Sequence, residues 1–255
     1  MQEKKKKNNQ NNEVVIDLKG MSKSFGNLTI LNKIDLQLHK TNNIAILGRS
    51  GTGKSVLLKC IVGLIPPDEG KINLLGKDID TLDEPELNQL RLRIGYLFQG
   101  GALYDSMTVR DNLSFPLKQN KIMIDENKIE DEVLDALSNV GLEDAINKMP
   151  SELSGGMKKR IGLARTLMLK PEIIFYDEPT TGLDPVTSSE ISELMQRINK
   201  KFKTSSLIVT HDMKCAEQTA DKIMILHDGK FIAGGQYKEL ENSEKKLVRS
   251  FFSYT

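Results

Sequence analysis

The eight residues 48–55 constrain the fold more than any other part of the chain. They read GRSGTGKS and match the pattern GxxxxGK[ST]. The apolar run 44–47 precedes them, and a segment with helical character, residues 56–62, follows. This order of buried strand, glycine-rich loop and helix is typical of an α/β protein whose loop wraps phosphate groups. The sequence therefore predicts an α/β fold built around a phosphate-binding loop.

The residue types in this loop fit the binding of a nucleotide triphosphate. Glycines let the backbone approach phosphate oxygens, while the loop amides and the helix N-terminus supply positive potential. We expect Lys54 to reach the β- and γ-phosphates and the Ser55 hydroxyl to bind Mg²⁺. The residues predicted to contact ATP here are Gly48, Arg49, Ser50, Gly51, Thr52, Gly53, Lys54, Ser55 and Val56.

A second apolar run, residues 173–176, leads directly into two carboxylates, Asp177 and Glu178. Ligands of open α/β sheets bind at the carboxyl ends of the strands, which predicts that this pair lies beside the phosphate loop. Asp177 is suited to hold Mg²⁺ through its water shell. Because side chains alternate along a strand, we expect Glu178 to point the other way and to polarise the attacking water.

Short apolar runs alternate with helical patterns along most of the chain. Runs 44–47, 173–176 and 207–209 are continuously apolar, as in central strands of a sheet covered on both faces. Further strands are expected at residues 14–18, 30–38, 71–74, 94–98, 222–226 and 230–233.

The predicted organisation is one domain with a helical block inside it. No strand is expected from residue 99 to about residue 169, and residues 127–140 place Ile129, Val133, Leu134, Leu137 and Val140 near one helix face. We expect a disordered polar tail at residues 1–12, a single domain at 13–240 with the helical subdomain inserted at about 100–169, and a C-terminal tail at 241–255.

Composition excludes several classes of protein. With 36 basic and 35 acidic residues the net charge is +1, which does not indicate a nucleic-acid partner. There is no run of eighteen apolar residues and no apolar stretch near the N-terminus, so a cytosolic protein is expected. Residues 4–7, all lysine, are interpreted as a solubilising tail, with contact to anionic lipid as the alternative. Cys60 and Cys215 form no CxxC pair and are expected to be small buried hydrophobes.

Five further motifs occur in the order in which they occur in ATP-binding-cassette (ABC) ATPases. They are Phe25, Gln99, the pentapeptide LSGGM at 153–157, Asp184 within GLDP, and His211. Over about residues 14–240 the chain therefore resembles an ABC-transporter nucleotide-binding subunit. The resemblance implies a P-loop NTPase core with a mixed sheet, an N-terminal antiparallel β-subdomain and an inserted helical subdomain.

The resemblance also implies a role for each of these positions. Phe25 would stack on adenine, although an apolar surface or core role is the alternative. Gln99 would reach Mg²⁺ and the attacking water, and His211 would sense the γ-phosphate. The expected catalytic residues are Glu178, His211 and Gln99, and the expected metal-binding residues are Ser55, Gln99 and Asp177.

In that family the pentapeptide contacts the nucleotide held by a second copy of the domain. Ser154 can cap a helix that begins near Met157, with the amides of Gly155 and Gly156 exposed at its N-terminus. The residues expected to act in trans are Ser154, Gly155, Gly156 and Asp184. Met157 stands where the family usually has Gln, so its ribose contacts or its tethering of the loop are expected to differ.

Three stretches are similar to the ATPases of Mla-type (MCE-system) phospholipid transporters. They are GRSGTGKSVLLK from residue 48, FQGGALYDSMTV from residue 98 and LSGGMKKRIGLARTL from residue 153. The resemblance implies ATP and Mg²⁺ as ligands and peripheral attachment to the cytoplasmic side of the inner membrane. The implied partners are a second copy of the chain, integral-membrane permease subunits and an MCE-type lipid-binding protein. Residues 246–252 resemble that group's C-terminal segment and are interpreted as a contact with the second subunit or as a frayed terminus.

Three alternatives remain beside a lipid-transport ATPase. The same ATPase could drive an amino-acid or ion importer, and its catalytic residues do not distinguish these cargoes from lipid. A soluble ABC protein acting on ribosomes or DNA is disfavoured, because the chain has one uninterrupted cassette. A nucleotide-binding scaffold without turnover is disfavoured by the presence of both Glu178 and His211.

Overall fold

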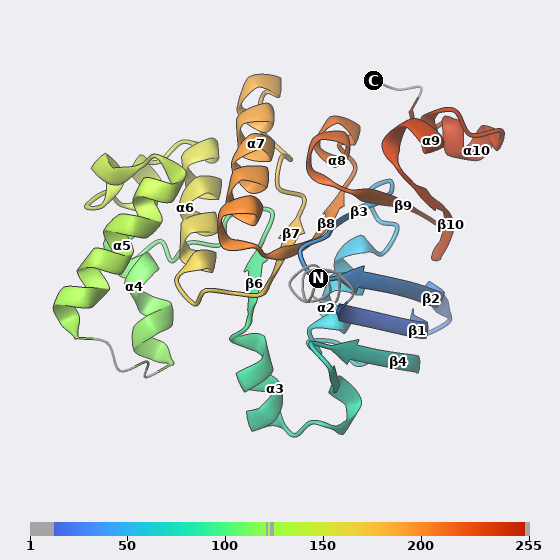
Figure 1. Cartoon of the computed structure of the whole chain (residues 1–255), viewed down its shortest axis with the longest axis horizontal. Coiled ribbons are helices and arrows are strands. Elements are labelled where there is room, and N and C mark those ends of the chain that lie inside the picture. The colour runs from blue at the N-terminus through green and yellow to red at the C-terminus, as the bar shows by residue number, and fades with distance from the viewer. Residues whose placement is uncertain (1–12, 121, 123–124, 253–255) are drawn as a thin grey trace, which may run out of the picture.

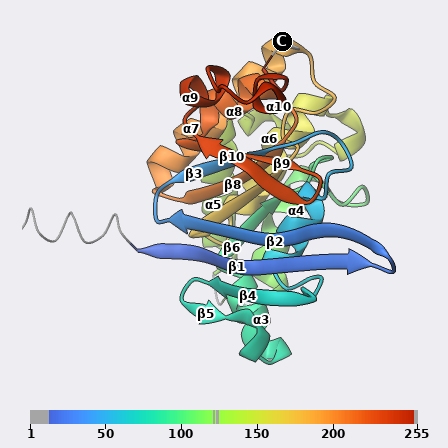
Figure 2. The same ribbon diagram turned by 90° about the vertical axis from the view of Figure 1, so that its right-hand side faces the viewer.

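The computed structural model describes residues 13–120, 122 and 125–252. The polar tail expected at residues 1–12 lies outside these ranges. Two sheets form the framework of the chain (Figures 1 and 2). The smaller sheet is antiparallel, with strand order β2-β1-β4-β5. Its strands are β1 Val14–Phe25, β2 Leu28–His39, β4 Glu69–Leu74 and β5 Lys77–Asp78.

The larger sheet has six strands in the order β10-β9-β3-β8-β7-β6. Neighbours from β9 to β6 pair in parallel, and β10 pairs with β9 antiparallel, which confirms the predicted mixed sheet. Its strands are β3 Asn43–Leu47, β6 Ile94–Leu97, β7 Ile173–Asp177, β8 Ser205–Thr210, β9 Lys222–His227 and β10 Lys230–Gly235. All five residues of β7 and all six of β8 are buried, as expected for central strands.

Alternating side chains of the central strands divide the core into two layers. In β3, Ile44 and Ile46 pack with α2 (Lys54–Ile61) and the antiparallel sheet, whereas Ala45 and Leu47 face the other helices. The parallel sheet is therefore covered on both faces, and α2 lies between the two sheets. Helix α3, Glu84–Arg91, adds Leu87 and Leu90 to the layer around α2.

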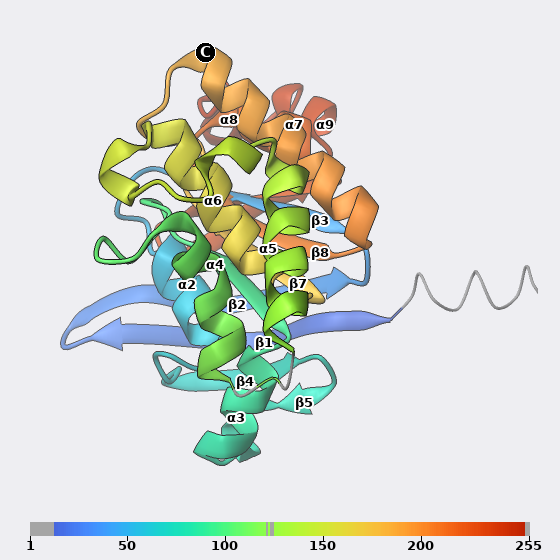
Figure 3. The same cartoon turned by 90° about the vertical axis from the view of Figure 1, so that its left-hand side faces the viewer.

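In the described residues between β6 and β7, three α-helices form a group on one side of the molecule (Figures 1 and 3). They are α4 Val109–Gln119, α5 Glu126–Val140 and α6 Gly155–Leu167. As predicted, the described residues between β6 and β7 contain no strand. The expected α5 face is correct for Val133 and Leu137, but Leu134 remains 42% exposed. The reason is geometric, because Leu134 is turned by about 100° from Val133 around a helix of 3.6 residues per turn.

Among the described residues of the C-terminal third, four α-helices follow: α7 Pro185–Phe202, α8 Met213–Thr219, α9 Tyr237–Glu241 and α10 Lys246–Arg249. The last segment is held by its own chain. Val248 is fully buried, and the rings of Phe251 and Phe252 contact those of His227 and Tyr237. The interpretation of residues 246–252 as a frayed terminus is therefore wrong. Three-residue 3-10 helices are present at Ile79–Thr81, Glu143–Ala145 and Pro150–Glu152.

Both cysteines are buried, and burial raises the pKa of each thiol to about 11. This confirms their interpretation as buried apolar side chains. Within the described ranges, no helix has the length and apolar character needed to cross a bilayer.

Candidate nucleotide-binding site

The phosphate loop joins the end of β3 to the first turn of α2. Gly53 has φ +95°, and a Cβ atom there would lie 2.6 Å from Cγ2 of Ile30, so this position requires glycine. Helix α2 begins at Lys54, two residues earlier than predicted. Lys54 and Ser55 are thus fixed on its first turn, at the positive end of its dipole.

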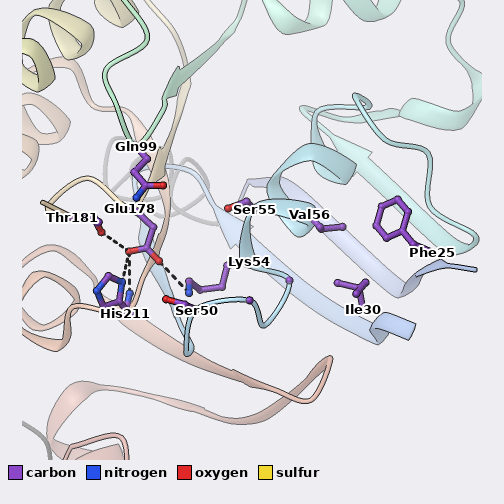
Figure 4. Close-up of a pocket in the computed structure, with 12 residues that line it drawn as sticks. Phe25, Ile30, Ser50, Lys54, Ser55, Val56, Gln99, Glu178, Thr181 and His211 are labelled. Atoms are coloured by element: carbon purple, nitrogen blue, oxygen red, sulfur yellow. Dashed lines mark hydrogen bonds and ion pairs between the residues drawn. The ribbon is translucent and has the colours of Figure 1, made fainter. Parts of the chain in front are cut away.

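A pocket opens beside this turn (Figure 4). It is lined by Phe25, Ile30, Ser50, Gly51, Gly53, Lys54, Ser55, Val56, Gln99, Glu178, Thr181 and His211. The pocket therefore brings together residues from six separate parts of the sequence. Three predicted loop residues do not line it: Gly48 is buried, and Arg49 and Thr52 are joined by a hydrogen bond from Thr52 Oγ1 to the Arg49 carbonyl of 2.9 Å.

The Lys54 ammonium lies on the inner side of the loop and is only 5% exposed. It donates to the carbonyl oxygens of Gly48 at 2.8 Å and Arg49 at 3.0 Å. Its third contact is Oε1 of Glu178 at 3.1 Å. The loop thus supplies a buried cation that faces the carboxylate expected to act in catalysis.

Asp177 ends β7 and is held by two hydroxyl groups. Ser55 Oγ donates to its Oδ1 at 3.0 Å, and Tyr96 Oη donates to its Oδ2 at 3.1 Å. Burial and the neighbouring Asp177 charge both raise the pKa of Tyr96, so its hydroxyl remains a donor. The Ser55 hydroxyl and the Asp177 carboxylate, both predicted metal ligands, therefore lie next to each other.

Glu178 does not continue the strand, and the predicted alternation is wrong for this residue. Strand β7 ends at Asp177, and Glu178 has φ +52°, a left-handed conformation that is uncommon outside glycine. This turn, and not the pleat of a strand, directs the carboxylate toward the loop. There its Oε2 lies 2.7 Å from Nδ1 of His211 and accepts from Thr181 Oγ1 at 3.0 Å (Figure 4).

Gln99 and Phe25 lie at different places along the pocket. Gln99 follows β6 and is exposed beside Glu178 (Figure 4). Phe25 ends β1 on the far side, is 50% exposed and has the Lys23 ammonium 5.4 Å from its ring centroid. Its exposure excludes the alternative of a core side chain.

The pentapeptide at residues 153–157 forms the start of α6. Ser154 is the N-cap, and its Oγ accepts from the Met157 amide at 3.2 Å, as predicted. The helix begins at Gly155, two residues before the expected start. Gly156 is buried beside Thr187, and a Cβ atom at this position would lie 2.7 Å from Thr187 Cγ2. Met157 is half-buried and packs against the apolar core of the helical layer.

Asp184 caps α7 and lies outside the pocket. Its carboxylate accepts from the amides of Val186 and Thr187 and from the Thr187 hydroxyl. These hydrogen bonds, chiefly those from Thr187, lower the pKa of Asp184. Asp184 and Gly156 thus both contact the first turn of α7.

Sequence reasoning missed four residues of the site: Ile30 and Thr181, which line the pocket, and Tyr96 and Lys159, which support it. Tyr96 precedes Gln99 on β6, but nothing in the sequence shows that β6 pairs with β7. Thr181 lies three residues after Glu178, a spacing that could have indicated a turn. Lys159 lies on α6 and binds the backbone of the 178–181 turn. The contacts of Tyr96 and Lys159 depend on tertiary structure, whereas the hydrogen bond from Thr181 to Glu178 lies within one turn.

Comparison with known proteins gives one consistent family. The family model described as "ABC transporter" matches residues 31–181. The chain is 41% identical over 240 residues to the probable ribonucleotide transport ATP-binding protein mkl of Mycobacterium leprae, covering 94% of this chain and 69% of that protein. It is 40% identical over 240 residues to the intermembrane phospholipid transport system ATP-binding protein MlaF of Haemophilus influenzae, covering 94% and 90%. Its identity to the methionine import ATP-binding protein MetN of Clostridium tetani is 37% over 238 residues, covering 92% and 74%.

A solved structure gives the same result for the fold. The dimeric post-hydrolysis state of the ATP-binding cassette MJ0796, bound to ADP and Pi, matches with a TM-score of 0.79 and 30% identity, covering 87% of this chain and 98% of that one. The predicted fold class is therefore confirmed. The chain belongs to the ABC transporter family and is an ATPase of the cassette type.

Proposed function

We propose that two copies of this ATPase close around ATP and drive a separate permease that moves phospholipid between membranes. The observation that carries the proposal is the composition of the pocket. Lys54, Glu178 and His211 converge in it, yet Ser154 is not among the described residues that line it. One chain thus supplies the phosphate loop and the carboxylate of its own site. The N-terminus of α6, capped by Ser154, is available to contact the nucleotide of a second copy.

Within each site, the chain's own residues bind and orient the substrate. Lys54 and the amides at the start of α2 hold the β- and γ-phosphates, and Phe25 stacks on adenine. Glu178 accepts a hydrogen bond from the attacking water and aligns it for in-line attack on the γ-phosphorus. His211 and Gln99 lie beside Glu178 and contact the γ-phosphate. The bond from the water oxygen to the γ-phosphorus forms as the bond to the β,γ-bridging oxygen breaks. Glu178 accepts the water proton and passes it to the inorganic phosphate, and ADP leaves.

The residues present fit a magnesium ion. A hydroxyl and a carboxylate converge where Ser55 Oγ and Asp177 Oδ1 lie 3.0 Å apart, and Gln99 adds an amide oxygen nearby. Among the described residues, no group of three or more His, Cys, Asp or Glu side chains could hold a metal ion. This suits Mg²⁺, which takes most of its oxygen ligands from water and substrate phosphates. When bound by Ser55, Asp177 and Gln99, the ion would neutralise phosphate charge.

The second copy completes the site through the N-terminus of α6. Ser154 offers its hydroxyl, and the amides of Gly155 and Gly156 at the helix start attract the γ-phosphate. Asp184, at the start of α7, lies on the same surface and contacts the partner chain. The isolated monomer then binds ATP but hydrolyses it slowly, because part of the charge stabilisation is absent.

The phospholipid cargo is supported by the relative MlaF, whose name assigns it to intermembrane phospholipid transport and which the match covers to 90%. In this arrangement the chain lies on the cytoplasmic face of the inner membrane, bound to permease subunits and, through them, to an MCE-type lipid-binding protein. The 37% identity to the methionine import protein MetN supports a second candidate function, in which the same ATPase drives an amino-acid importer.

Purification of the native complex through this chain tests the two candidates directly. Membranes are solubilised, the chain is captured with its permease, and bound small molecules are extracted and identified by mass spectrometry. Phospholipid at a fixed ratio to the permease, which is lost when the complex dissociates, supports the proposal. A complex that contains an amino-acid-binding protein and retains no phospholipid contradicts it and favours the importer.

A further inference from the structure

Lys159 is a buried lysine whose ammonium, among the described residues, contacts only backbone oxygens. It lies on the second turn of α6, five residues after the Ser154 cap, and is 5% exposed. Its Nζ donates to the carbonyls of Pro179 at 2.7 Å and Thr181 at 2.6 Å, and lies 3.5 Å from that of Glu178. In the part of the chain that the structure describes, no carboxylate forms an ion pair with it. An ammonium has three donors, and here all three point at one turn.

That turn is the one that sets the direction of the catalytic carboxylate. Glu178 has φ +52°, a left-handed backbone conformation that is unfavourable for a residue with a Cβ atom and is retained where the surrounding structure supports it. The backbone of the turn is closed by a hydrogen bond from the Thr181 amide to the Glu178 carbonyl of 3.3 Å. A cation that gathers the carbonyls of residues 178, 179 and 181 favours this conformation over an extended continuation of β7.

Burial of the Lys159 charge is unfavourable, which argues that the contacts have a use. Burial lowers the pKa of Lys159 to about 8, and the nearby Cys215 and Glu178 offset part of that effect. A buried charge without a carboxylate partner is retained only where several strong hydrogen bonds compensate it. An apolar side chain of similar length would avoid the cost of burying a charge but would leave the Pro179 and Thr181 carbonyls without this donor.

Helix α6 touches other parts of the site as well. Gly156 packs on Thr187 at the start of α7, and Gly101, two residues after Gln99, packs on the backbone of α6 at Lys158. Arg165 also donates to the Gly101 carbonyl at 3.4 Å. The helix that carries Ser154 is thus in contact with the segment that follows Gln99 and with the start of α7.

We infer that Lys159 is a positioning residue that fixes the 178–181 turn to the helix carrying Ser154. The inference rests on the proposed function, in which Ser154 acts on the nucleotide of the second copy while Glu178 acts on its own. A chain's Lys159 therefore links the two sites of the dimer: a shift of α6 against the partner's nucleotide moves the turn that orients the chain's own carboxylate.

The test uses the full chain and three variants. Lys159→Met keeps the length of the side chain and removes its charge and donors, whereas Lys159→Gln keeps N–H donors. Lys158→Met is the matched control, because it makes the same change one residue away on a side chain for which the described residues provide no hydrogen bond or ion pair. For each variant we measure steady-state Mg-ATPase rate against protein concentration, affinity for a fluorescent ATP analogue, and the thermal unfolding midpoint.

The expected result is a split between binding and turnover. Lys159→Met should lower kcat at least tenfold, and its rate per chain should no longer rise with protein concentration. Its affinity for the analogue should stay within twofold of wild type. This pattern is expected when interactions made in the transition state are removed. Lys159→Gln should recover part of the kcat, and Lys158→Met should behave as wild type. If Lys159→Met keeps its kcat, or if Lys159→Gln is folded, binds the analogue and is no more active than Lys159→Met, the inference is wrong. Loss of turnover in Glu178→Gln, measured in parallel, reports on the proposed function separately.

Discussion

Glu178 and His211 are joined through both the side chain and the backbone of the histidine. Oε2 of Glu178 lies 2.7 Å from the His211 ring at Nδ1 and accepts from the His211 amide at 3.3 Å. The residue that follows β7 is thereby tied to the residue that follows β8. Since Lys54 contacts the other carboxylate oxygen at 3.1 Å, one carboxylate connects three segments of the pocket.

Replacement of Glu178 by Gln should separate binding from hydrolysis. The amide keeps the shape of the side chain but cannot act as a base, so kcat is expected to fall by about 10²–10⁴-fold. ATP binding is expected to persist, because Lys54 is freed from its ion pair to contact phosphate. Steady-state Mg-ATPase assays and equilibrium binding of a fluorescent ATP analogue measure the two effects. An unchanged turnover rate in Glu178→Gln would remove this residue from the mechanism.

The ring of Phe25 should contribute to affinity through stacking on the adenine. Phe25→Ala is expected to weaken ATP binding by about 1–3 kcal/mol, or roughly 5- to 150-fold in Kd. Phe25→Tyr keeps an aromatic face and serves as the matched control, with affinity close to wild type. Titration of each variant with the fluorescent analogue measures Kd. Equal Kd values for Phe25→Ala and wild type would indicate that the ring is only a surface residue.

The Tyr96 hydroxyl should matter for the use of magnesium. Tyr96→Phe removes the hydrogen bond to Asp177 Oδ2 without changing the shape of the ring. Loss of an outer partner of a metal-ligating group typically costs about 10–100-fold in metal affinity or activity, so the Mg²⁺ concentration for half-maximal ATPase should rise. Tyr104→Phe is the control, because the described residues form no hydrogen bond with the Tyr104 hydroxyl. The same Mg²⁺ dependence in Tyr96→Phe and Tyr104→Phe would contradict the assignment of Asp177.

The two glycines of the pentapeptide should differ in their tolerance of a methyl group. A Cβ atom at Gly156 would lie 2.7 Å from Thr187 Cγ2, whereas at Gly155 it would lie 3.5 Å from Leu183 Cδ2, an ordinary contact. Gly156→Ala is therefore expected to lose about 1–3 kcal/mol of unfolding free energy through overpacking, and Gly155→Ala much less. Denaturant unfolding measures both. Adding Thr187→Ser, which removes Cγ2, should restore stability to Gly156→Ala; if it does not, the clash is not the cause.

The parts of the fold that were predictable have local signals. The apolar run 44–47 leads into the phosphate loop, and the apolar run 173–176 leads into Asp177. They form β3 and β7, as expected. The cap at Ser154 also follows from its own sequence neighbours. Each of these features depends on residues within one turn or one strand, which is why the sequence alone indicates them.

The parts that were not predictable depend on contacts between distant segments. Glu178 takes a left-handed conformation that its residue type does not favour, and Lys159 and His211 stabilise the turn from distant parts of the chain. Likewise, Tyr96 meets Asp177 only because β6 and β7 are neighbours in the sheet. Pairing of these elements is a property of the tertiary structure and has no counterpart in the local pattern.

The central claim is that Ser154 of one copy and Glu178 of the other form a single catalytic site. Mixing two impaired variants tests it most directly. Ser154→Asp keeps an N-cap residue but places a negative charge where phosphate is expected, and Ser154→Asn is its neutral control. Ser154→Asp and Glu178→Gln should each be nearly inactive alone. A mixed dimer of the two contains one site with both native residues, so mixing should restore ATPase activity. If the mixture stays as inactive as its components while the dimers are shown to exchange subunits, the two residues do not act across the interface and the account is wrong.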